Sequence, residues 1–174
     1  MFTTQQVNKN NFMQLKDIQF SVQVYNSSEE LPAADAALLT EARKITQVAY
    51  APYSNFFVGA AAMLTNGSTI KGTNQENASY PVGICAERAL MSAAATQFPE
   101  VGISTMAISY DNKNGGSGHP ISPCGMCRQF LAEFEERTHQ PMRLILAGMN
   151  GEVYVIQTAK QLLPLSFTSG DLKK

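Results

Sequence analysis

Three cysteines and one glutamate have the types and spacing of a metal centre with a proton-transferring group beside it. Cys85 precedes Glu87 by two positions, and the segment Pro123-Cys124-Gly125-Met126-Cys127 follows further along the chain. The sequence contains three cysteines in all. An odd number of thiols does not suit a disulfide framework, whereas thiolates are preferred ligands of zinc. We therefore expect Cys85, Cys124 and Cys127 to hold one metal ion, with zinc favoured and iron as the alternative.

The fourth corner of a tetrahedral site is open to three interpretations. His119, His139 or solvent can fill it, because cysteine supplies three ligands. A structural zinc site fills all four corners with protein, whereas a catalytic site keeps one corner for water. The sequence alone leaves these interpretations open.

Glu87 and Arg88 have expected roles around that metal. On one helical turn the Glu87 carboxylate can stand beside the ion without binding it, and there it can move protons between water and a substrate. Three thiolates carry more negative charge than Zn²⁺ neutralises. We expect Arg88 to offset this charge by donating a hydrogen bond to a ligand sulfur.

Each part of the pattern has a plainer interpretation when it is taken alone. A CxxC pair is typical of a structural zinc knuckle, a single cysteine is commonly buried in a core, and a single helical glutamate is commonly solvated. The combination of C-x-E with a later P-C-x-x-C is much more specific. It is the pattern of zinc-dependent deaminases of nucleobases.

The elements that must position these residues alternate between strands and helices. Helices predicted over Cys85–Gln97 and Cys124–Arg137 place both cysteine groups at N-termini, where the helix dipole favours thiolate over thiol. A further helix is predicted over Ala34–Tyr50, ended by Pro52. Strands are predicted over 17–25, Phe56–Leu64, Ser68–Thr73, Ile103–Tyr110, Arg143–Ala147 and Val153–Gln157, with a helical turn over Ala159–Leu163. The sum is an α/β domain.

Two kinds of connection between these elements are predicted. Asn66-Gly67 and Asn150-Gly151 are expected to supply the positive-φ residues of two tight hairpins, so that the last two strands run antiparallel. The stretch Asp111–His119 is predicted to be a surface loop, and nothing in it suggests chemistry.

Composition limits the class of protein. The chain has 174 residues, of which 44% are hydrophobic and 16% charged, which is an ordinary globular balance. Its formal net charge is -1, so no basic surface for nucleic acid is indicated. No apolar run approaches the roughly 20 residues that span a bilayer. We expect a cytoplasmic protein that binds neither membrane nor nucleic acid, with a flexible N-terminus over 1–16 and one domain over 17–174.

The chain resembles the small, homo-oligomeric, zinc-dependent cytidine deaminases over roughly Leu38 to Leu172. The motifs that carry the resemblance are Pro52–Ala60 (PYSNFFVGA), Gly72–Pro81 (GTNQENASYP), Gly83–Arg88 (GICAER), Ser122–Gln129 (SPCGMCRQ) and Leu162–Phe167 (LLPLSF). The resemblance implies a three-layer α/β/α fold with a mixed, mostly five-stranded sheet. It also implies hydrolysis of cytidine or deoxycytidine to uridine or deoxyuridine and ammonia, a reaction of pyrimidine salvage.

The resemblance also implies a role for individual residues. Cys85, Cys124 and Cys127 are the implied zinc ligands and Glu87 the proton shuttle. Asn74 and Glu76 are implied to bind ribose hydroxyls, Phe56 to pack on the pyrimidine, the Ala86 backbone to hold the base, and Phe167 to reach a neighbouring subunit. The alternative for either Phe is core packing, and for Asn74 and Glu76 it is fixing a loop.

Several points depart from the family or stay open. Ala89 stands where many relatives have Thr. The N-terminal region is longer than is usual in the family and has a possible extra strand, which puts the oligomeric state in doubt. A tetramer is favoured over a dimer. Three other functions are considered: deamination of a nucleoside antibiotic, editing of nucleic acid, and a non-catalytic zinc module. The sequence does not rank cytidine against deoxycytidine.

Overall fold

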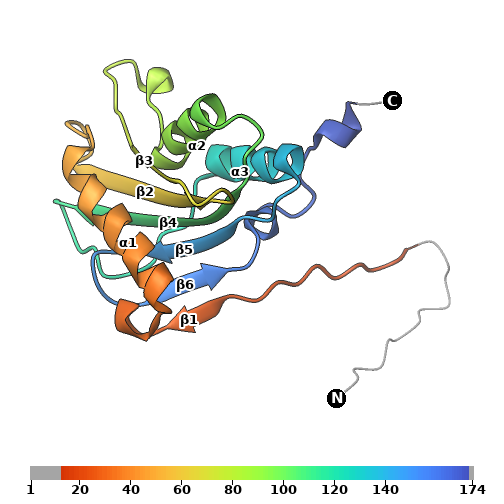
Figure 1. Cartoon of the computed structure of the whole chain (residues 1–174), viewed down its shortest axis with the longest axis horizontal. Coiled ribbons are helices and arrows are strands. Elements are labelled where there is room, and N and C mark those ends of the chain that lie inside the picture. The colour runs from red at the N-terminus through yellow and green to blue at the C-terminus, as the bar shows by residue number, and fades with distance from the viewer. Residues whose placement is uncertain (1–12, 173–174) are drawn as a thin grey trace.

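A computed structural model describes residues 13–172, and all its named strands join one mixed sheet in the order β1-β6-β5-β4-β2-β3 (Figure 1). Only β4 and β5 pair in parallel, and the other neighbours are antiparallel. The strands are β1 (Gln23–Tyr25), β2 (Phe56–Leu64), β3 (Thr69–Thr73), β4 (Ile103–Asn112), β5 (Arg143–Ala147) and β6 (Val153–Ile156). The prediction of a mixed sheet with antiparallel last strands and an added N-terminal strand is confirmed.

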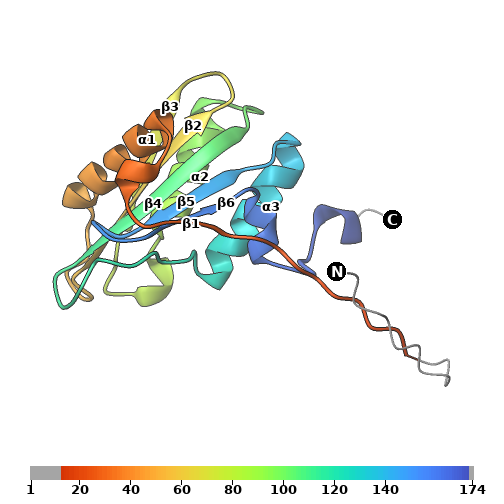
Figure 2. The ribbon, with the colours of Figure 1, turned by 90° about the horizontal axis from the view of Figure 1, so that it is seen from below.

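Three helices cover the two faces of this sheet. Helix α1 (Ala33–Ile45) lies on one face, and α2 (Ala86–Gln97) and α3 (Gly125–Thr138) lie on the other (Figures 1 and 2). Successive strand residues point to opposite faces. Accordingly Ala61 packs in the core beneath α1, whereas Ala60 and Ala62 pack in the core beneath α2 and α3. The structure therefore has the three layers that were predicted.

The start of α2 is held very close to β3. A Cβ atom added to Gly72 of β3 would lie 2.6 Å from the Ala86 carbonyl oxygen and 2.6 Å from the Leu90 amide nitrogen. No side chain fits in that space, so glycine permits the first turn of α2 to rest directly on the sheet. This contact fixes the place of Cys85, which immediately precedes the helix.

Two predicted elements are shorter than expected. The strand predicted over 17–25 is confirmed only at Gln23–Tyr25, because β1 pairs with just the three residues Val153–Val155 of β6. The helix predicted over Ala34–Tyr50 ends at Ile45 and continues as a 3-10 turn over Thr46–Val48. The Thr46 hydroxyl donates to the Arg43 carbonyl at 2.8 Å, a local hydrogen bond that competes with the helical pattern.

The two hairpin turns use one positive-φ residue each, not two. Gly67 has a φ of 85° and Gly151 a φ of 77°, but neither Asn66 nor Asn150 has a positive φ. Instead, the Asn66 side chain accepts a hydrogen bond from the Ser68 amide at 2.9 Å. The prediction that both Asn66 and Gly67 have a positive φ was therefore wrong, although both predicted hairpins are present.

The first twelve residues of the N-terminus predicted to be flexible (1–16) lie outside the described residues, as do 173 and 174. Residues 13–22 belong to no helix or strand and are exposed. In the described part, no helix is both long and apolar enough to cross a membrane. The predicted division into an N-terminal segment and one domain over 17–174 stays a prediction.

Glu135 of α3 fastens the segment after β6 to the helix. Its buried carboxylate accepts hydrogen bonds from the backbone amides of Met142 (2.6 Å), Ala159 (2.9 Å) and Lys160 (3.0 Å), and from the Thr158 hydroxyl (2.8 Å). One carboxylate thus satisfies four donors. It fixes the 3-10 turn Ala159–Leu162 against the helix that carries two of the cysteines.

We expect the substitution Glu135→Gln to destabilise the fold by about 2–4 kcal/mol, because an amide presents donors to buried N–H groups and leaves some of them unpaired. Urea unfolding followed by circular dichroism measures this change. Glu133→Gln is the matched control, since Glu133 is exposed on the same helix. Equal unfolding free energies for the two variants would contradict the anchoring role.

Candidate metal and substrate site

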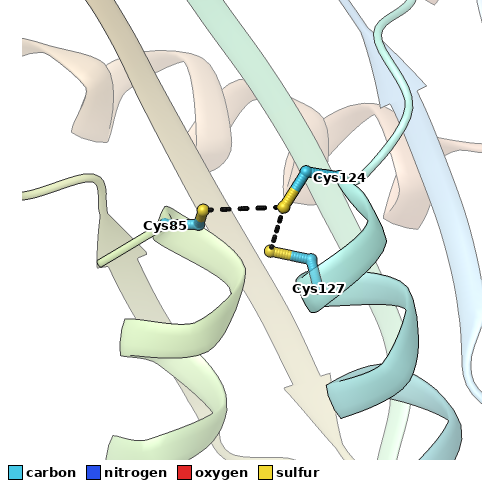
Figure 3. A group of neighbouring side chains, drawn as sticks. All are labelled: Cys85, Cys124 and Cys127. Atoms are coloured by element: carbon cyan, nitrogen blue, oxygen red, sulfur yellow. Dashed lines mark hydrogen bonds between the residues drawn. The ribbon is translucent and has the colours of Figure 1, made fainter. Parts of the chain in front are cut away.

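The three cysteines come together where two helices begin. Cys85 is the N-cap residue of α2 and Cys124 the N-cap residue of α3, and neither side chain makes a capping hydrogen bond to its helix. Cys127 lies one turn into α3 and is buried. Figure 3 shows the three sulfur atoms pointing toward one another from these two helix ends. The predicted helix starts at Cys85 and Cys124 are thus correct to within one residue.

The distances between the sulfur atoms suit a tetrahedral metal site. The Sγ atoms of Cys85 and Cys124 are 3.9 Å apart, and those of Cys124 and Cys127 are 3.5 Å apart. All three ligand atoms lie within 4.8 Å of one another. Two sulfurs bound at tetrahedral angles to zinc, each about 2.3 Å from the ion, would be about 3.8 Å apart. The donor set and its spacing therefore fit zinc.

Neither histidine joins this group. Among the described residues, the candidate ligand cluster contains the three cysteines and no other side chain. His139 is the C-cap of α3, at the opposite end of the helix from Cys124. His119 makes its hydrogen bond with Tyr110 instead. Within residues 13–172 no histidine therefore lies near enough to be a fourth ligand of this group, which favours the interpretation that solvent fills the fourth corner.

The local charges favour a thiolate at Cys85. Hydrogen bonding from the Cys127 thiol, helped by Cys124, lowers the pKa of Cys85 to about 6. The same interaction raises the pKa of Cys127, because Cys127 is the donor to that thiolate, and its burial acts in the same direction. Both helix N-termini also favour negative charge at this point. The cluster is therefore prepared to hold a cation.

Glu87 lies beside the cluster without being part of it. Its side chain is 5% exposed, and burial raises the pKa of its carboxyl group above the usual range. Its own backbone N–H and the Cys127 thiol oppose that rise in pKa. Its oxygens are not among the clustered ligand atoms. Glu87 is thus a buried acid next to the three sulfurs but outside the ligand group.

Arg88 acts on the cluster through charge. Its positive charge helps to lower the pKa of Cys85. Within residues 13–172, no hydrogen bond joins its guanidinium to a cysteine sulfur. The predicted hydrogen bond from Arg88 to a ligand sulfur is therefore not seen in this structure. The expected compensation of negative charge by Arg88 is seen.

Asn74 braces the beginning of β2. Its Oδ1 accepts from the Val58 amide at 2.8 Å, and its Nδ2 donates to the Phe56 carbonyl at 2.8 Å. The amide thus mimics a paired strand residue. One Nδ2 hydrogen and one Oδ1 lone pair are not used by these two bonds, so fixing the chain does not exclude a contact with a hydroxyl.

Glu76 braces the loop that precedes β2. Its carboxylate accepts from the amides of Tyr53 (2.9 Å) and Ser54 (3.3 Å) and from the Ser54 hydroxyl (2.5 Å). Desolvation raises the pKa of Glu76, but the hydrogen bonds from Ser54 and Tyr53 together outweigh it and lower the pKa below its usual value, so the carboxylate stays ionised at neutral pH. The loop-fixing interpretation therefore describes the contacts of Glu76, and a partly exposed anion remains beside the beginning of β2.

The two phenylalanines singled out in the sequence lie in different surroundings. Phe56 is half-buried, and its ring stacks on Tyr110 with centroids 4.7 Å apart and planes 14° apart. Phe167 is 59% exposed, and its backbone carbonyl accepts from the Gln129 side chain at 2.8 Å. Core packing therefore does not describe Phe167.

Sequence reasoning missed the contact between two residues next to this site. Tyr110 was predicted only as a buried strand residue, and His119 was considered only as a possible fourth metal ligand. The structure joins them by a 3.0 Å hydrogen bond behind Phe56. The sequence offered one signal of this contact, which is a histidine before a proline in a loop otherwise made of small and polar residues.

The sequence model of the family described as the cytidine and deoxycytidylate deaminase zinc-binding region matches residues 32–140, which include all three cysteines and Glu87. The chain belongs to this deaminase family. Zinc is thus the family's metal, which confirms the predicted cofactor at the level of the family.

Individual relatives agree with this assignment. The chain is 37% identical over 135 residues to the cytidine deaminase of Halalkalibacterium halodurans, a match that covers 78% of the chain and 95% of that protein. It is 36% identical over 135 residues to the cytidine deaminase of Sporosarcina psychrophila, covering 78% and 92%. A crystal structure of cytidine deaminase from Burkholderia pseudomallei superposes with a TM-score of 0.66 at 37% identity, over 75% of this chain and 97% of that one. The predicted deaminase family and fold are confirmed.

Proposed function

We propose that this protein is a hydrolase acting on cyclic amidines that deaminates cytidine and deoxycytidine with one zinc ion per subunit. The observation that carries the proposal is the group of three sulfurs with a buried carboxyl group beside it. A structural zinc site with four protein ligands does not require a buried carboxyl group beside those ligands, whereas a hydrolytic site requires one to transfer protons. Membership of the deaminase family names the reaction.

Glu87 carries out the proton transfers of the proposed reaction. A bound zinc ion would lower the pKa of a water molecule to around 7 in favourable sites. The Glu87 carboxylate takes one proton from the attacking water and delivers it to the pyrimidine ring nitrogen N3. It then takes the second proton of that water, from the hydroxyl group now on C4, and delivers it to the amine as the bond between C4 and nitrogen breaks. The raised pKa of Glu87 suits a group that must hold and release a proton in turn. The products are uridine or deoxyuridine and ammonia.

The first turn of α2 offers groups that hold the base. Backbone N–H groups in the first turn of a helix have no partner within the helix. We assign those of Cys85 and Ala86 to the base and to the attacking oxygen. Arg88, one position beyond Glu87, reduces the negative charge that three thiolates bring to this place.

Asn74 and Glu76 are assigned to the ribose hydroxyls. An amide and a carboxylate together offer donors and acceptors that match a hydroxyl group. Their backbone-directed hydrogen bonds hold both side chains in fixed orientations beside the beginning of β2. This rigidity means that little side-chain freedom is lost when the sugar binds.

We expect the substitution Glu76→Gln to raise the KM for cytidine by roughly tenfold or more, because a hydrogen bond to a charged group contributes about 1.5–3 kcal/mol. Steady-state kinetics with cytidine measure this change. Glu41→Gln is the control, since Glu41 is an exposed carboxylate that pairs with Lys44 and Lys71 on α1's side of the molecule. A KM equal to that of the unaltered protein would refute the ribose contact.

Phe56 is assigned to the face of the pyrimidine, and Phe167 to the pocket of a neighbouring subunit. The exposure of Phe167, together with that of Tyr53, Tyr80 and Met126, leaves large apolar side chains that a partner subunit would cover. We propose a homo-oligomer on this basis, a tetramer in preference to a dimer. Cytoplasmic location, a role in pyrimidine salvage and a single catalytic domain over 17–174 complete the proposal.

A substrate panel on zinc-loaded protein tests the function. Loss of absorbance is followed with cytidine, deoxycytidine, blasticidin S and cytosine within single-stranded DNA. We expect turnover of the two free nucleosides. Turnover of the antibiotic alone, or of the DNA alone, would replace the proposal by the corresponding alternative, and no turnover of any compound would favour a non-catalytic zinc module.

A further inference from the structure

We propose that Tyr110 and His119 are positioning residues that set the place of the Phe56 ring and thereby the affinity for the nucleoside. This inference rests on the proposed function, in which Phe56 packs against the pyrimidine. Three contacts carry it: the stacking of Phe56 on Tyr110, the hydrogen bond of Tyr110 to His119, and the fastening of the loop that holds His119.

Tyr110 forms a flat support behind Phe56. The register places Tyr110 of β4 opposite Val58 of β2, so Phe56 is its diagonal neighbour on the same face of the sheet. That face is the one covered by α2 and α3, which bear the cysteines. Tyr110 is 1% exposed, whereas Phe56 in front of it is half-buried. One side of the Phe56 ring thus rests on a buried ring.

The hydroxyl group of Tyr110 forms its hydrogen bond with the His119 ring. A buried hydroxyl group needs a hydrogen-bond partner. Among residues 13–172 its partner is the His119 ring, whose Nδ1 lies 3.0 Å from the Tyr110 oxygen. The two rings meet edge to face, with centroids 5.7 Å apart. Loss of this bond would leave a buried polar atom unpaired next to the aromatic pair.

The loop that carries His119 is fastened to the turn between β5 and β6 and to the end of β4. The Ser117 carbonyl accepts from the Met149 amide at 2.7 Å, and the Ser117 hydroxyl accepts from the Asn112 amide at 2.8 Å. A Cβ atom on Gly148 would lie 1.9 Å from the Ser117 carbonyl oxygen, and one on Gly151 would lie 2.1 Å from that of Gly118. His119 is therefore presented from a fixed loop, although its side chain is exposed.

A pair of variants separates the hydrogen bond from the rest of the histidine. His119→Ala removes the partner, and we expect the KM for cytidine to rise roughly three- to tenfold, with kcat within twofold and zinc content unchanged. His119→Asn should restore most of the affinity, because its amide places a polar atom near the position of Nδ1. Tyr110→Phe, which removes only the hydroxyl, should reproduce the KM of His119→Ala.

The control and the double variants make the inference falsifiable. His139→Asn alters the other histidine, at the far end of α3, where a φ of 50° tolerates asparagine, and it should leave KM unchanged. In a Phe56→Leu background, His119→Ala should add nothing further, because the pair acts through Phe56. The dissociation constant for uridine, measured by calorimetry, should change in parallel with KM.

Three results would overturn the inference while the unaltered protein deaminates cytidine: an unchanged KM in His119→Ala, an unchanged KM in Tyr110→Phe, or a full effect of His119→Ala in the Phe56→Leu background. The last of these would assign a direct substrate contact to His119. If the unaltered, zinc-loaded protein fails to deaminate cytidine, the proposed function itself falls, and this inference falls with it.

Discussion

The substitution Glu87→Gln is expected to lower kcat for cytidine by roughly 100- to 10,000-fold while the protein keeps its zinc. General acid–base catalysis by one positioned group typically contributes a factor of this size. Glutamine has the shape of glutamate but cannot take up and return a proton. Glu87 lies outside the candidate ligand group, so the three sulfurs should hold the ion as before. Steady-state assays and zinc analysis on the same preparation measure both quantities.

The fold should tolerate this change. Burial already raises the pKa of Glu87, so a neutral amide at this position removes a costly buried charge and creates none. The melting temperature should therefore stay close to that of the unaltered protein. Glu133→Gln, on the exposed side of α3, is the control and should leave kcat unchanged. A Glu87→Gln protein with full turnover would show that another group moves the protons.

The second large effect is expected from Cys127→Ala. Cys127 is fully buried beside the other two sulfurs and the Glu87 carboxyl group, and we propose it as one of three protein ligands. Loss of groups that only support a metal ligand typically costs 10–100-fold in metal affinity, so loss of the ligand itself should cost more. We expect the purified variant to contain little zinc and to show no measurable deamination.

Thermal melting separates this loss of zinc from a failure to fold. A ligand that binds only the folded state raises the melting temperature as its concentration rises. Added zinc should therefore stabilise the unaltered protein and should not stabilise Cys127→Ala. Met126→Ala is the matched control, since Met126 lies between the two cysteines of the CxxC pair and is 65% exposed. A Cys127→Ala protein with a full complement of zinc would contradict the ligand assignment.

The parts of the fold that were predictable follow from local rules. The continuous apolar run Phe56–Leu64 and the glycines at 67 and 151 indicate strands and turns without reference to the rest of the chain. The helix starts at Cys85 and Cys124 were predictable because a proline or a loop precedes an alanine- or leucine-rich run. Both cysteine groups were therefore correctly placed at helix N-termini before any tertiary contact was known.

The errors arose where a distant partner decides the outcome. The alternation over 17–25 is regular, but β6 offers only three pairing residues, so most of that stretch has no strand partner. Arg88 was expected to bond to sulfur on grounds of charge alone, and charge does not specify the direction of a side chain. Tyr110 of β4 meets His119 where the turn between β5 and β6 holds the loop that carries His119, and no local pattern encodes that contact.

The central claim is that three sulfurs hold the zinc ion on which deamination of cytidine depends, and removal and return of that ion test it most directly. Zinc is stripped from purified protein with a chelator, restored in steps, and measured on each sample together with uridine formation from cytidine. We expect turnover to vanish with the zinc and to return in proportion to it, reaching its full value at one ion per chain. Turnover that persists in zinc-free protein, or that stays absent at one zinc per chain, would contradict the account.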